Sequence, residues 1–427
     1  MTELRAELAV GGVVLVGPDP LVQSKRGEVW RGLSPGLRRA PQLVACTLTR
    51  PWVVADASAR RSLLHRAAVR AAIGCDAAPR HLGTWEFDAG DGTGIAVADE
   101  YGGDLRLFDV ARALAAAAGP GGRLPVEIAF YVTWQVARLH RAAQALGAEV
   151  ELTSDPNDVL LDWDGRVRVV VNTRPPRGAA ASASDFAYLA PERLRSRESK
   201  GGETWSIGVQ LYELLGGRHP FRKMGALETM NAIMNGPTQP LSALRPDLHR
   251  SVAGLVERCL RPDPKARPQL GPLADALGAA LERASAKPTA VLAGLLGRAL
   301  PERRSEASAL RSRLTLLNVE RLLREVPALS SRRITLAPLA VDPPPSLDYD
   351  GLTFAPSAGP DADPTVVEPD LDVEAATVAI DLDAETTVIS PDLDDGETTA
   401  VGADLEAETV AVSGADAGAL MPRAPGD

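Results

Sequence analysis

The spacing of apolar residues changes near residue 105 of this 427-residue chain, and this change most limits the folds that are open to it. Before that point, short apolar runs are separated by Gly, Pro and Asp, which is typical of β-strands joined by turns. After it, apolar residues recur every three or four positions, as Ile128 and Val132 do, which is typical of helices. The pattern predicts an α+β fold in which a small β-rich lobe, 10–104, precedes a larger helical lobe, 105–286.

The last part of the chain differs in composition from the rest. Residues 339–427 contain 21 acidic residues and one basic residue, Arg423, whereas the preceding part has 45 basic and 35 acidic residues. A segment this acidic and rich in Pro, Gly and Ala cannot bury enough apolar area to offset the entropy of ordering, so we predict a disordered acidic tail. Between lobe and tail, residues 287–338 predict an Arg-rich helical extension with helices near 290–300 and 309–326. This extension either enlarges the helical lobe or forms a separate arm.

Composition also excludes several classes of protein. Cys46, Cys75 and Cys259 lie far apart, so neither a zinc site nor a disulfide framework is predicted. No apolar run approaches the roughly 18 residues that cross a membrane, and the N-terminus does not resemble a signal peptide, so we expect a cytoplasmic protein without membrane contact. Nothing supports nucleic-acid binding beyond the modest positive charge of the body. The abundance of Ala, Leu, Val, Arg and Gly is typical of a GC-rich bacterial genome.

Three segments of the helical lobe carry a family resemblance. They read "FAYLAPERL" at 186–194, "ETWSIGVQLYELLGGRHPF" at 203–221 and "LVERCLRPDPKARPQL" at 255–270. In this order they resemble the end of the activation segment, the central helix and the late Arg-Pro segment of bacterial serine/threonine protein kinases. The resemblance covers about 10–285 and implies the two-lobed protein-kinase-like fold, with a small β-rich N-lobe and a large helical C-lobe.

The resemblance also implies structural roles for four residues. Glu192 and Arg267 occupy the positions of a buried ion pair that ties the activation segment to the distal helices. Trp205 lies where the family anchors its buried central helix. Glu203 stands where family members usually have an Asp that holds the backbone of the catalytic loop, and its extra methylene puts that hold in question.

In the small lobe, the resemblance implies a site for ATP with Mg²⁺. "KRGEVWRGL" resembles the end of the glycine-rich loop, of which Gly27 survives clearly, and "AVADEYGGDL" resembles the hinge that contacts adenine, with Glu100 and Tyr101 at its start. "LVACTL" resembles the strand that ends in the phosphate-binding lysine, but Thr47 occupies the lysine position. No lysine occurs between Lys25 and Lys200, and the helix 57–74, which should supply the partner Glu near Ala67, contains no acid.

The catalytic loop departs from the family as well. Anchored on "PNDVLL", the His-Arg-Asp positions hold Glu151, Leu152 and Thr153, and a threonine cannot act as a general base near pH 7. Asp155 replaces the loop lysine. Asp158 stands for the metal-binding Asn and could still coordinate magnesium.

The Asp-Phe-Gly segment has lost its carboxylate in either alignment. Its Asp position holds Val171 or Asn172, depending on a one-residue register, and Asn172 would be a weak neutral metal ligand. Four roles are therefore vacated: the phosphate clamp, its orienting acid, the general base and the second metal ligand.

These departures favour a pseudokinase that serves as a scaffold or regulator in signalling. The alternative hypothesis is an atypical serine/threonine kinase that uses Lys25 on the glycine-rich loop in place of the missing lysine, with Asp155, Asp158 and Asn172 around the metal. A third is a nucleotide-binding switch without catalysis. The simpler interpretations are that Lys25 is a solvated loop lysine and that Asp155 and Asp158 are turn residues beside a proline.

The acidic tail contains a short repeat around threonine. Five threonines recur at separations of 12, 10, 12 and 10 residues: Thr365, Thr377, Thr387, Thr399 and Thr409. They resemble the phosphothreonine segments read by forkhead-associated domains, although low-complexity drift explains the repeat equally well. "SRRITL" offers Thr335 to a kinase that prefers basic sequences. We therefore expect an active kinase and a phosphothreonine-reading domain as partners.

Overall fold

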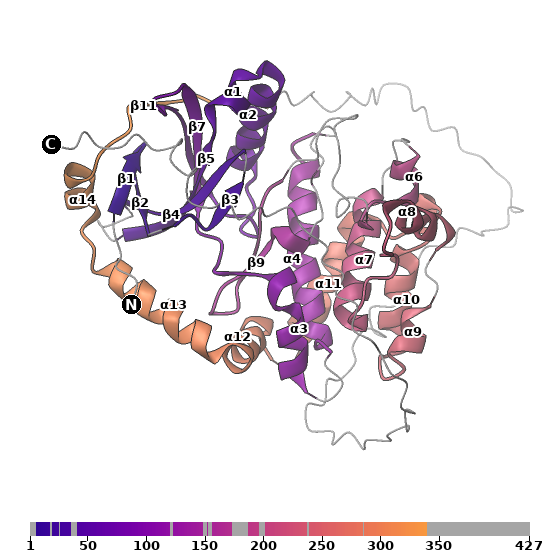
Figure 1. Cartoon of the computed structure of the whole chain (residues 1–427). Coiled ribbons are helices and arrows are strands. Elements are labelled where there is room, and N and C mark those ends of the chain that lie inside the picture. Colours follow the sequence, from indigo (N-terminus) through magenta and orange to yellow (C-terminus); the bar gives the residue numbers. More distant parts are fainter. Residues whose placement is uncertain are drawn as a thin grey trace, which may run out of the picture.

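The computed structural model places a small lobe built on a β-sheet beside a large helical lobe, as the sequence predicts (Figure 1). It describes residues 6–17, 19–24, 26–35, 41–119, 123–147, 152, 156–172, 187–195, 201–236, 239–284 and 286–339. The arrangement is the two-lobed protein-kinase-like fold.

The small lobe contains an antiparallel sheet in the order β1-β2-β4-β5-β7-β6-β11, with β3 paired to β4. Its strands are β1 (Ala6–Val10), β2 (Val13–Val16), β3 (Val22–Ser24), β4 (Gly27–Pro35), β5 (Pro41–Thr49), β6 (His81–Asp88), β7 (Thr93–Glu100) and β11 (Ser331–Arg333). The first seven strands are contiguous in the small lobe, whereas β11 comes from far along the chain. Turn residues separate the strands, as the sequence pattern predicts.

Alternation along the strands gives this sheet two different faces. Cys46 and Leu48 of β5 lie in one apolar cluster with Trp30 and Phe87. The residues between these in the sequence point to the other side of the sheet, which faces the helices α1 (Pro51–Ala55) and α2 (Ala57–Ala72). There Val97 packs near two leucines of α2. We call this second face, which carries Val29, Arg31, Thr47, Val97 and Asp99, the α2 face of the sheet.

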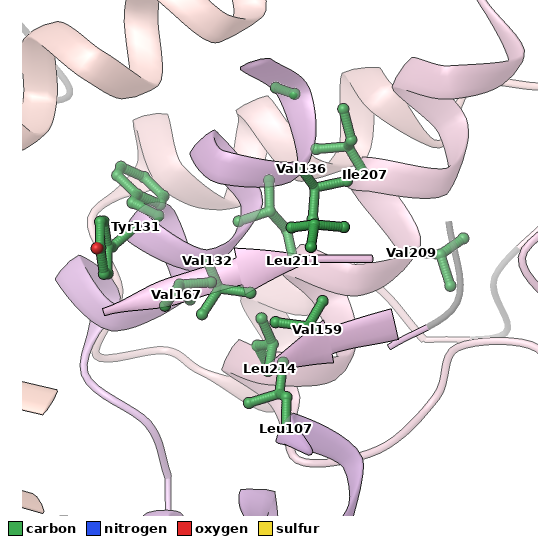
Figure 2. Packing of buried hydrophobic residues seen from close by; sticks show 14 of the residues in the cluster. Leu107, Tyr131, Val132, Val136, Val159, Val167, Ile207, Val209, Leu211 and Leu214 are labelled. Carbon is green, nitrogen blue, oxygen red and sulfur yellow. The ribbon is translucent and has the colours of Figure 1, made fainter. Parts of the chain in front are cut away.

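The large lobe packs around α4 and α7, with a small sheet of order β10-β9-β8 against them (Figure 2). Its elements are α3 (Leu107–Ala118), α4 (Val126–Gln144), α6 (Pro191–Leu194), α7 (Gly202–Gly216), α8 (Ala226–Asn235), α9 (Leu241–Leu244), α10 (Arg250–Cys259), α11 (Leu270–Arg283), β8 (Leu105–Arg106), β9 (Val159–Leu161), β10 (Val167–Val169) and the 3-10 turns η2 (Pro156–Asp158) and η3 (Pro264–Ala266). Nearly every side chain of α7 is buried, because this helix runs through the centre of the lobe. Within the described ranges, no helix is both long and apolar enough to cross a membrane.

Residues 287–339 form an arm that runs from the large lobe back to the small lobe (orange in Figure 1). It consists of α12 (Pro288–Ala299), α13 (Pro301–Thr315), α14 (Val319–Glu325) and β11. The sequence predicts one continuous helix over 309–326, but the chain breaks after α13. The side chain of Asn318 accepts a hydrogen bond from the Arg321 amide at 3.0 Å, which starts α14 as a new helix.

Three parts of the arm contact different parts of the body. Leucines of α12 are buried in the core of the large lobe, and α12 packs on α3 and α4. Apolar residues of α13 and α14 cover Val14, Val16 and Leu33 on the outer strands of the small lobe. The strand β11 then extends the same sheet beside β6. The arm therefore joins both lobes through buried apolar area.

Candidate functional site

Thr47 lies on the α2 face of the sheet, at the centre of β5. It pairs in register with Val29 of β4 and Val97 of β7, and its side chain is half-buried. The position is where the family resemblance puts the phosphate-binding lysine. A threonine there supplies a hydroxyl but no charge.

Helix α2 presents a cation to this face instead of a carboxylate. Arg70 donates from Nη1 to the Asp99 carboxylate at 2.8 Å and from Nε to the carbonyl oxygen of Val171 at 3.1 Å. Asp99 also lies 2.9 Å from Nδ1 of His81. In an active kinase the strand supplies the cation and the helix the acid. In this chain the helix supplies the cation, and the acid comes from the end of β7.

A second arginine on the same helix adds to the positive charge. Arg66 precedes Arg70 by one turn, and no ion pair joins it to a carboxylate among the described residues. Burial lowers the pKa of the Arg66 guanidinium, and the neighbouring Arg70 and Arg26 lower it further. Asp99 pairs with Arg70, and Arg66 is a second, half-buried cation one turn earlier on the same helix.

The hinge candidates Glu100 and Tyr101 have their backbone amides engaged within the protein. The Glu100 amide donates to the Arg80 carbonyl at 2.8 Å, and the Tyr101 amide donates to the Leu43 carbonyl at 3.2 Å. The Tyr101 hydroxyl donates to Asp104 at 2.9 Å. Burial, together with that carboxylate, raises the pKa of Tyr101 to about 12.

Arg31 reaches from β4 to the same hinge. Its guanidinium lies 5.6 Å from the centre of the Tyr101 ring and 3.8 Å from the Asp104 carboxylate. Gly27, the surviving glycine of the loop, has a packing role at the start of β4. A Cβ atom at this position would come within 2.2 Å of the Leu48 carbonyl oxygen on β5. Close approach of the two strands therefore requires glycine whether or not phosphate binds.

The two metal candidates, Asp158 and Asn172, lie in contact. Nδ2 of Asn172 donates to Oδ1 of Asp158 at 2.5 Å, while Val171 beside it is buried. Asn172 rather than Val171 therefore faces the loop residue. The pair offers one carboxylate and one amide, which is a reversal of the loop Asn and strand Asp of active kinases. Among the described residues, no group of three or more His, Cys, Asp or Glu could hold a metal ion.

Several predicted positions lie outside the described residues. These are Lys25, Thr153, Asp155 and the five tail threonines, Thr365, Thr377, Thr387, Thr399 and Thr409. Their sequence-based roles stay predictions. Thr335 is described, and it is exposed two residues after the end of β11.

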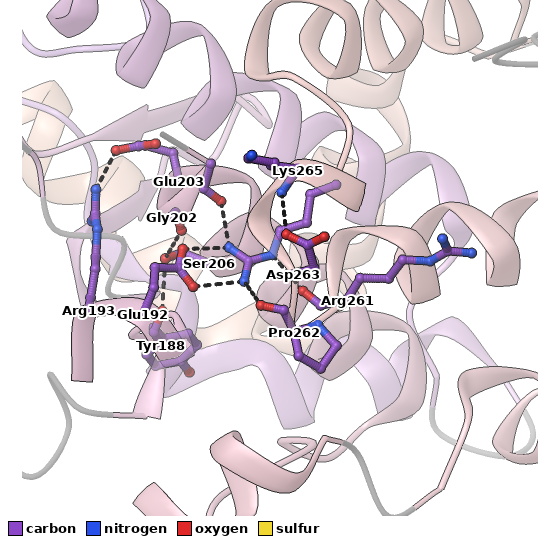
Figure 3. A network of polar contacts seen from close by, with 12 residues as sticks. Tyr188, Glu192, Arg193, Gly202, Glu203, Ser206, Arg261, Pro262, Asp263 and Lys265 are labelled. Carbon is purple, nitrogen blue, oxygen red and sulfur yellow. Dashed lines mark hydrogen bonds and ion pairs between the residues drawn. The ribbon is translucent and has the colours of Figure 1, made fainter. Parts of the chain in front are cut away.

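The structural ion pair is buried in the large lobe (Figure 3). Arg267 donates from Nη1 and Nη2 to the two Glu192 oxygens, at 2.7 and 2.8 Å. Its guanidinium also donates to three backbone carbonyls and lies 5.0 Å from the ring of Trp205. Trp205 in turn stacks on Phe221 at 5.2 Å. These contacts join α6 to the first turn of α7 and to the turn at η3.

Glu203 pairs with an arginine close to it in sequence. Nη2 of Arg193 donates to Oε1 of Glu203 at 2.6 Å, and both side chains are mostly buried. Burial would raise the pKa of Glu203, but the charges of Arg193 and His140 and a backbone hydrogen bond outweigh it and hold the pKa below its ordinary value. This carboxylate is therefore ionised and held by α6.

Sequence reasoning missed three residues of this region: Arg70, Asp99 and Arg311. Arg311 of α13 pairs with Asp104 at 3.1 Å and also with Asp162 next to β9. The absence of acids from α2 indicated a lost glutamate but did not point to Arg70. In "ADEY", the hinge interpretation used Glu100 and left Asp99 without a role. Nothing local in the sequence of α13 signals that one of its many arginines meets the hinge.

Comparison with known proteins shows a likeness to protein kinases, and the domain match lies in the large lobe. The protein kinase domain model matches residues 161–277. The serine/threonine-protein kinase PknA of Mycobacterium tuberculosis is 30% identical over 167 residues, which cover 37% of this chain and 38% of PknA. The tyrosine-protein kinase MasK of Myxococcus xanthus is 30% identical over 139 residues, covering 30% of this chain and 20% of MasK. Mitogen-activated protein kinase kinase kinase 10 of Mus musculus is 40% identical over 93 residues, covering 21% and 10%.

This chain thus spans less than two fifths of the length of these relatives. The domain match begins at β9, so it includes Asn172, Glu192 and Arg267 but neither Thr47 nor the His-Arg-Asp positions. The fold described above continues the likeness through the small lobe. The chain therefore carries a protein-kinase-like domain, homologous to bacterial serine/threonine and tyrosine kinases.

Proposed function

We propose that this chain is a cytoplasmic pseudokinase that transfers no phosphate and acts as a scaffold or regulator in signalling. The observation that carries the proposal is the contact of Arg70 with Asp99 and with the Val171 carbonyl. It places a carboxylate on the strand side and a cation on the helix side, the reverse of the pair that clamps ATP phosphates in active kinases.

The physical argument concerns the charge that the transfer needs. Phosphoryl transfer depends on cations held in place where negative charge lies on the phosphates. Removing one preorganised donor of this kind typically lowers kcat by about 10²–10³. Thr47 has no charge, and Arg70 already bonds Asp99 and a backbone carbonyl, so it cannot turn to a phosphate without leaving Asp99 unpaired.

The metal site is weakened but not abolished. Magnesium is bound in such enzymes through one or two carboxylates and the nucleotide phosphates. Asp158 offers one carboxylate, and Asn172 would have to give up its donated hydrogen bond and turn its carbonyl oxygen outward. ATP with Mg²⁺ is the ligand class that the family resemblance implies for this site, but with one carboxylate and no phosphate clamp we expect Mg²⁺ to add nothing to nucleotide binding.

The test is a transfer assay with the full chain. Wild type, Lys25→Ala and Lys223→Ala are each incubated with γ-labelled ATP, Mg²⁺ or Mn²⁺ and a generic protein substrate. We expect no label in the substrate or in the chain above a reaction without protein. Transfer by wild type and Lys223→Ala that is lost in Lys25→Ala would overturn the proposal in favour of an atypical serine/threonine kinase.

The repeated tail supports a second part of the proposal. A separate active kinase would phosphorylate the tail threonines, and a phosphothreonine-reading domain would then bind them, with the repeat providing avidity. Tail-containing and tail-deleted chains, each treated with such a kinase, are compared for binding to a forkhead-associated domain. Equal binding by both chains would refute this part.

A further inference from the structure

The end of the arm is held on the small lobe by two successive contacts. Leu329 is buried in the small-lobe core and donates its amide to the Ala9 carbonyl at 2.8 Å, and the short strand β11 follows it. β11 pairs with β6 through three residues, with Ser331 opposite Phe87 and Arg333 opposite Trp85. On either side of the strand, the Asp88 amide donates to the Ser330 carbonyl at 3.0 Å, and the Ile334 amide donates to the Thr84 carbonyl at 2.8 Å. All three residues of β11 are exposed, so the pairing is accessible to solvent.

Both arginines of this strand are engaged by β6 and its neighbours. Nη2 of Arg332 donates to Oε2 of Glu86 at 2.8 Å, and Glu86 also accepts from Arg60 of α2. Arg333 donates to the Leu82 carbonyl at 3.2 Å, and its guanidinium lies 5.8 Å from the Trp85 ring. The two side chains that give "SRRITL" its basic character are therefore part of the docked strand.

The next residue anchors the strand under α2. Ile334 packs against a cluster that contains Ile95 and Val97 of β7, together with Leu63 and Leu64 of α2. The same helix carries Arg70 one to two turns later. Docking of β11 therefore reaches the helix that faces the candidate site.

Thr335 is the first residue beyond this anchor, and it is exposed. Arg332 lies three residues before it and Arg333 two residues before it. Kinases that select substrates by basic residues read such side chains with acidic pockets, so substrate recognition and Glu86 compete for the same guanidinium. We propose that Thr335 is phosphorylated by a separate basophilic serine/threonine kinase, and that this modification and the docking of β11 on β6 exclude one another.

The chemistry requires only ATP and that separate kinase. The Thr335 hydroxyl oxygen attacks the γ-phosphorus of ATP, a new P–O bond forms, and the bond to the β-phosphate oxygen breaks. The hydroxyl proton passes to the base of the acting kinase, and ADP leaves. The proposal does not depend on whether this chain can itself transfer phosphate.

The new group changes the charges around the strand. A phosphothreonine carries about −1.5 to −2 charges near pH 7 and accepts strong hydrogen bonds from arginine. It offers Arg332 and Arg333 a partner within their own segment, in competition with Glu86 and the Leu82 carbonyl. The segment from β11 onward is then released from β6, and Ile334 leaves the cluster under α2.

The experiment uses the full chain and a purified kinase that requires arginine three residues before the acceptor. Labelling of Thr335 is followed by mass spectrometry in wild type, Glu86→Gln, Asp275→Asn and Thr335→Val, with a reaction lacking the added kinase as background. Glu86→Gln frees Arg332 without changing the recognised segment. Asp275→Asn breaks an exposed ion pair with Arg141 in the large lobe, which makes no contact with β11, and serves as the matched control.

We expect phosphate at Thr335 in wild type. Labelling of Glu86→Gln should be about two- to fivefold faster, because an exposed ion pair such as Arg332 with Glu86 contributes little free energy. The rate in Asp275→Asn should equal that of wild type. Hydrogen exchange of the amides of β11 and of Ile334 should become faster by at least a similar factor once Thr335 is phosphorylated. Absence of phosphate at Thr335 in all chains, or equal labelling rates with unchanged exchange, would overturn the proposal.

Discussion

Replacing Arg267 with methionine should destabilise the large lobe strongly. The substitution keeps much of the side-chain volume but removes both hydrogen bonds to Glu192 and those to the carbonyls of Gly201, Arg261 and Pro262. The Glu192 side chain is only 8% exposed, so its charge would stay buried without a partner. Breaking a buried pair in this way typically costs about 3–5 kcal/mol.

The assay is urea unfolding followed by tryptophan fluorescence, because Trp205 lies directly under the Arg267 guanidinium. The matched control is Asp275→Asn, which removes an exposed pair with Arg141 and should cost no more than about 1 kcal/mol. The double variant Glu192→Gln, Arg267→Met removes the stranded charge and should lose less stability than the two single variants added together. A loss below about 1 kcal/mol in Arg267→Met, equal to the control, would refute the assignment of this pair as a structural bond.

Three further perturbations test other parts of the structure. Burial, with the nearby arginine charge, lowers the pKa of His219 to about 3, so as the pH falls through 6.5 the unfolded chain takes up a proton that the folded chain does not. The unfolding free energy should therefore fall by about 1.4 kcal/mol in total between pH 7.5 and 5.5, and His219→Gln should lose this part of the pH dependence in urea unfolding. Arg311→Gln leaves Asp104 and Asp162 without their shared cation and should cost about 1–2 kcal/mol, with faster hydrogen exchange in α13. Gly165 has φ of +78°, and a Cβ there would lie 1.9 Å from a backbone carbonyl oxygen of α12. Gly165→Ala should therefore lower the unfolding free energy by about 1–3 kcal/mol in the same assay. An unchanged value would show that α12 does not pack against this turn.

The large lobe could be predicted because its helices follow from apolar spacing and because three of its segments resemble those of protein kinases. The resemblance to protein kinases implies that Glu192 and Arg267 pair, and the two side chains form a buried ion pair in the structure. The apolar period of 124–146 likewise gives α4 directly. These features are local, and each agrees with the packing around it.

The candidate site in the small lobe was less predictable, because its decisive contact joins residues that no pattern relates. Arg70 and Asp99 are separated by a helix end and two strands, and each looks like an ordinary surface charge in the sequence. Their pairing follows only once the sheet register sets Asp99 on the α2 face. The return of the arm to β6 was also beyond local reasoning, since a three-residue strand of Ser and Arg carries no apolar alternation.

The central claim is that the site lacks a clamp for nucleotide phosphates, and a comparison of ligands tests it most directly. The unfolding temperature of the full chain is measured with ATP and with adenosine, each with and without Mg²⁺, since a ligand present at 100 times its Kd adds about 2.7 kcal/mol of stability. The account predicts that Mg²⁺ gives ATP no advantage over adenosine. A Mg²⁺-dependent stabilisation by ATP alone, lost in Asp158→Ala, would contradict it.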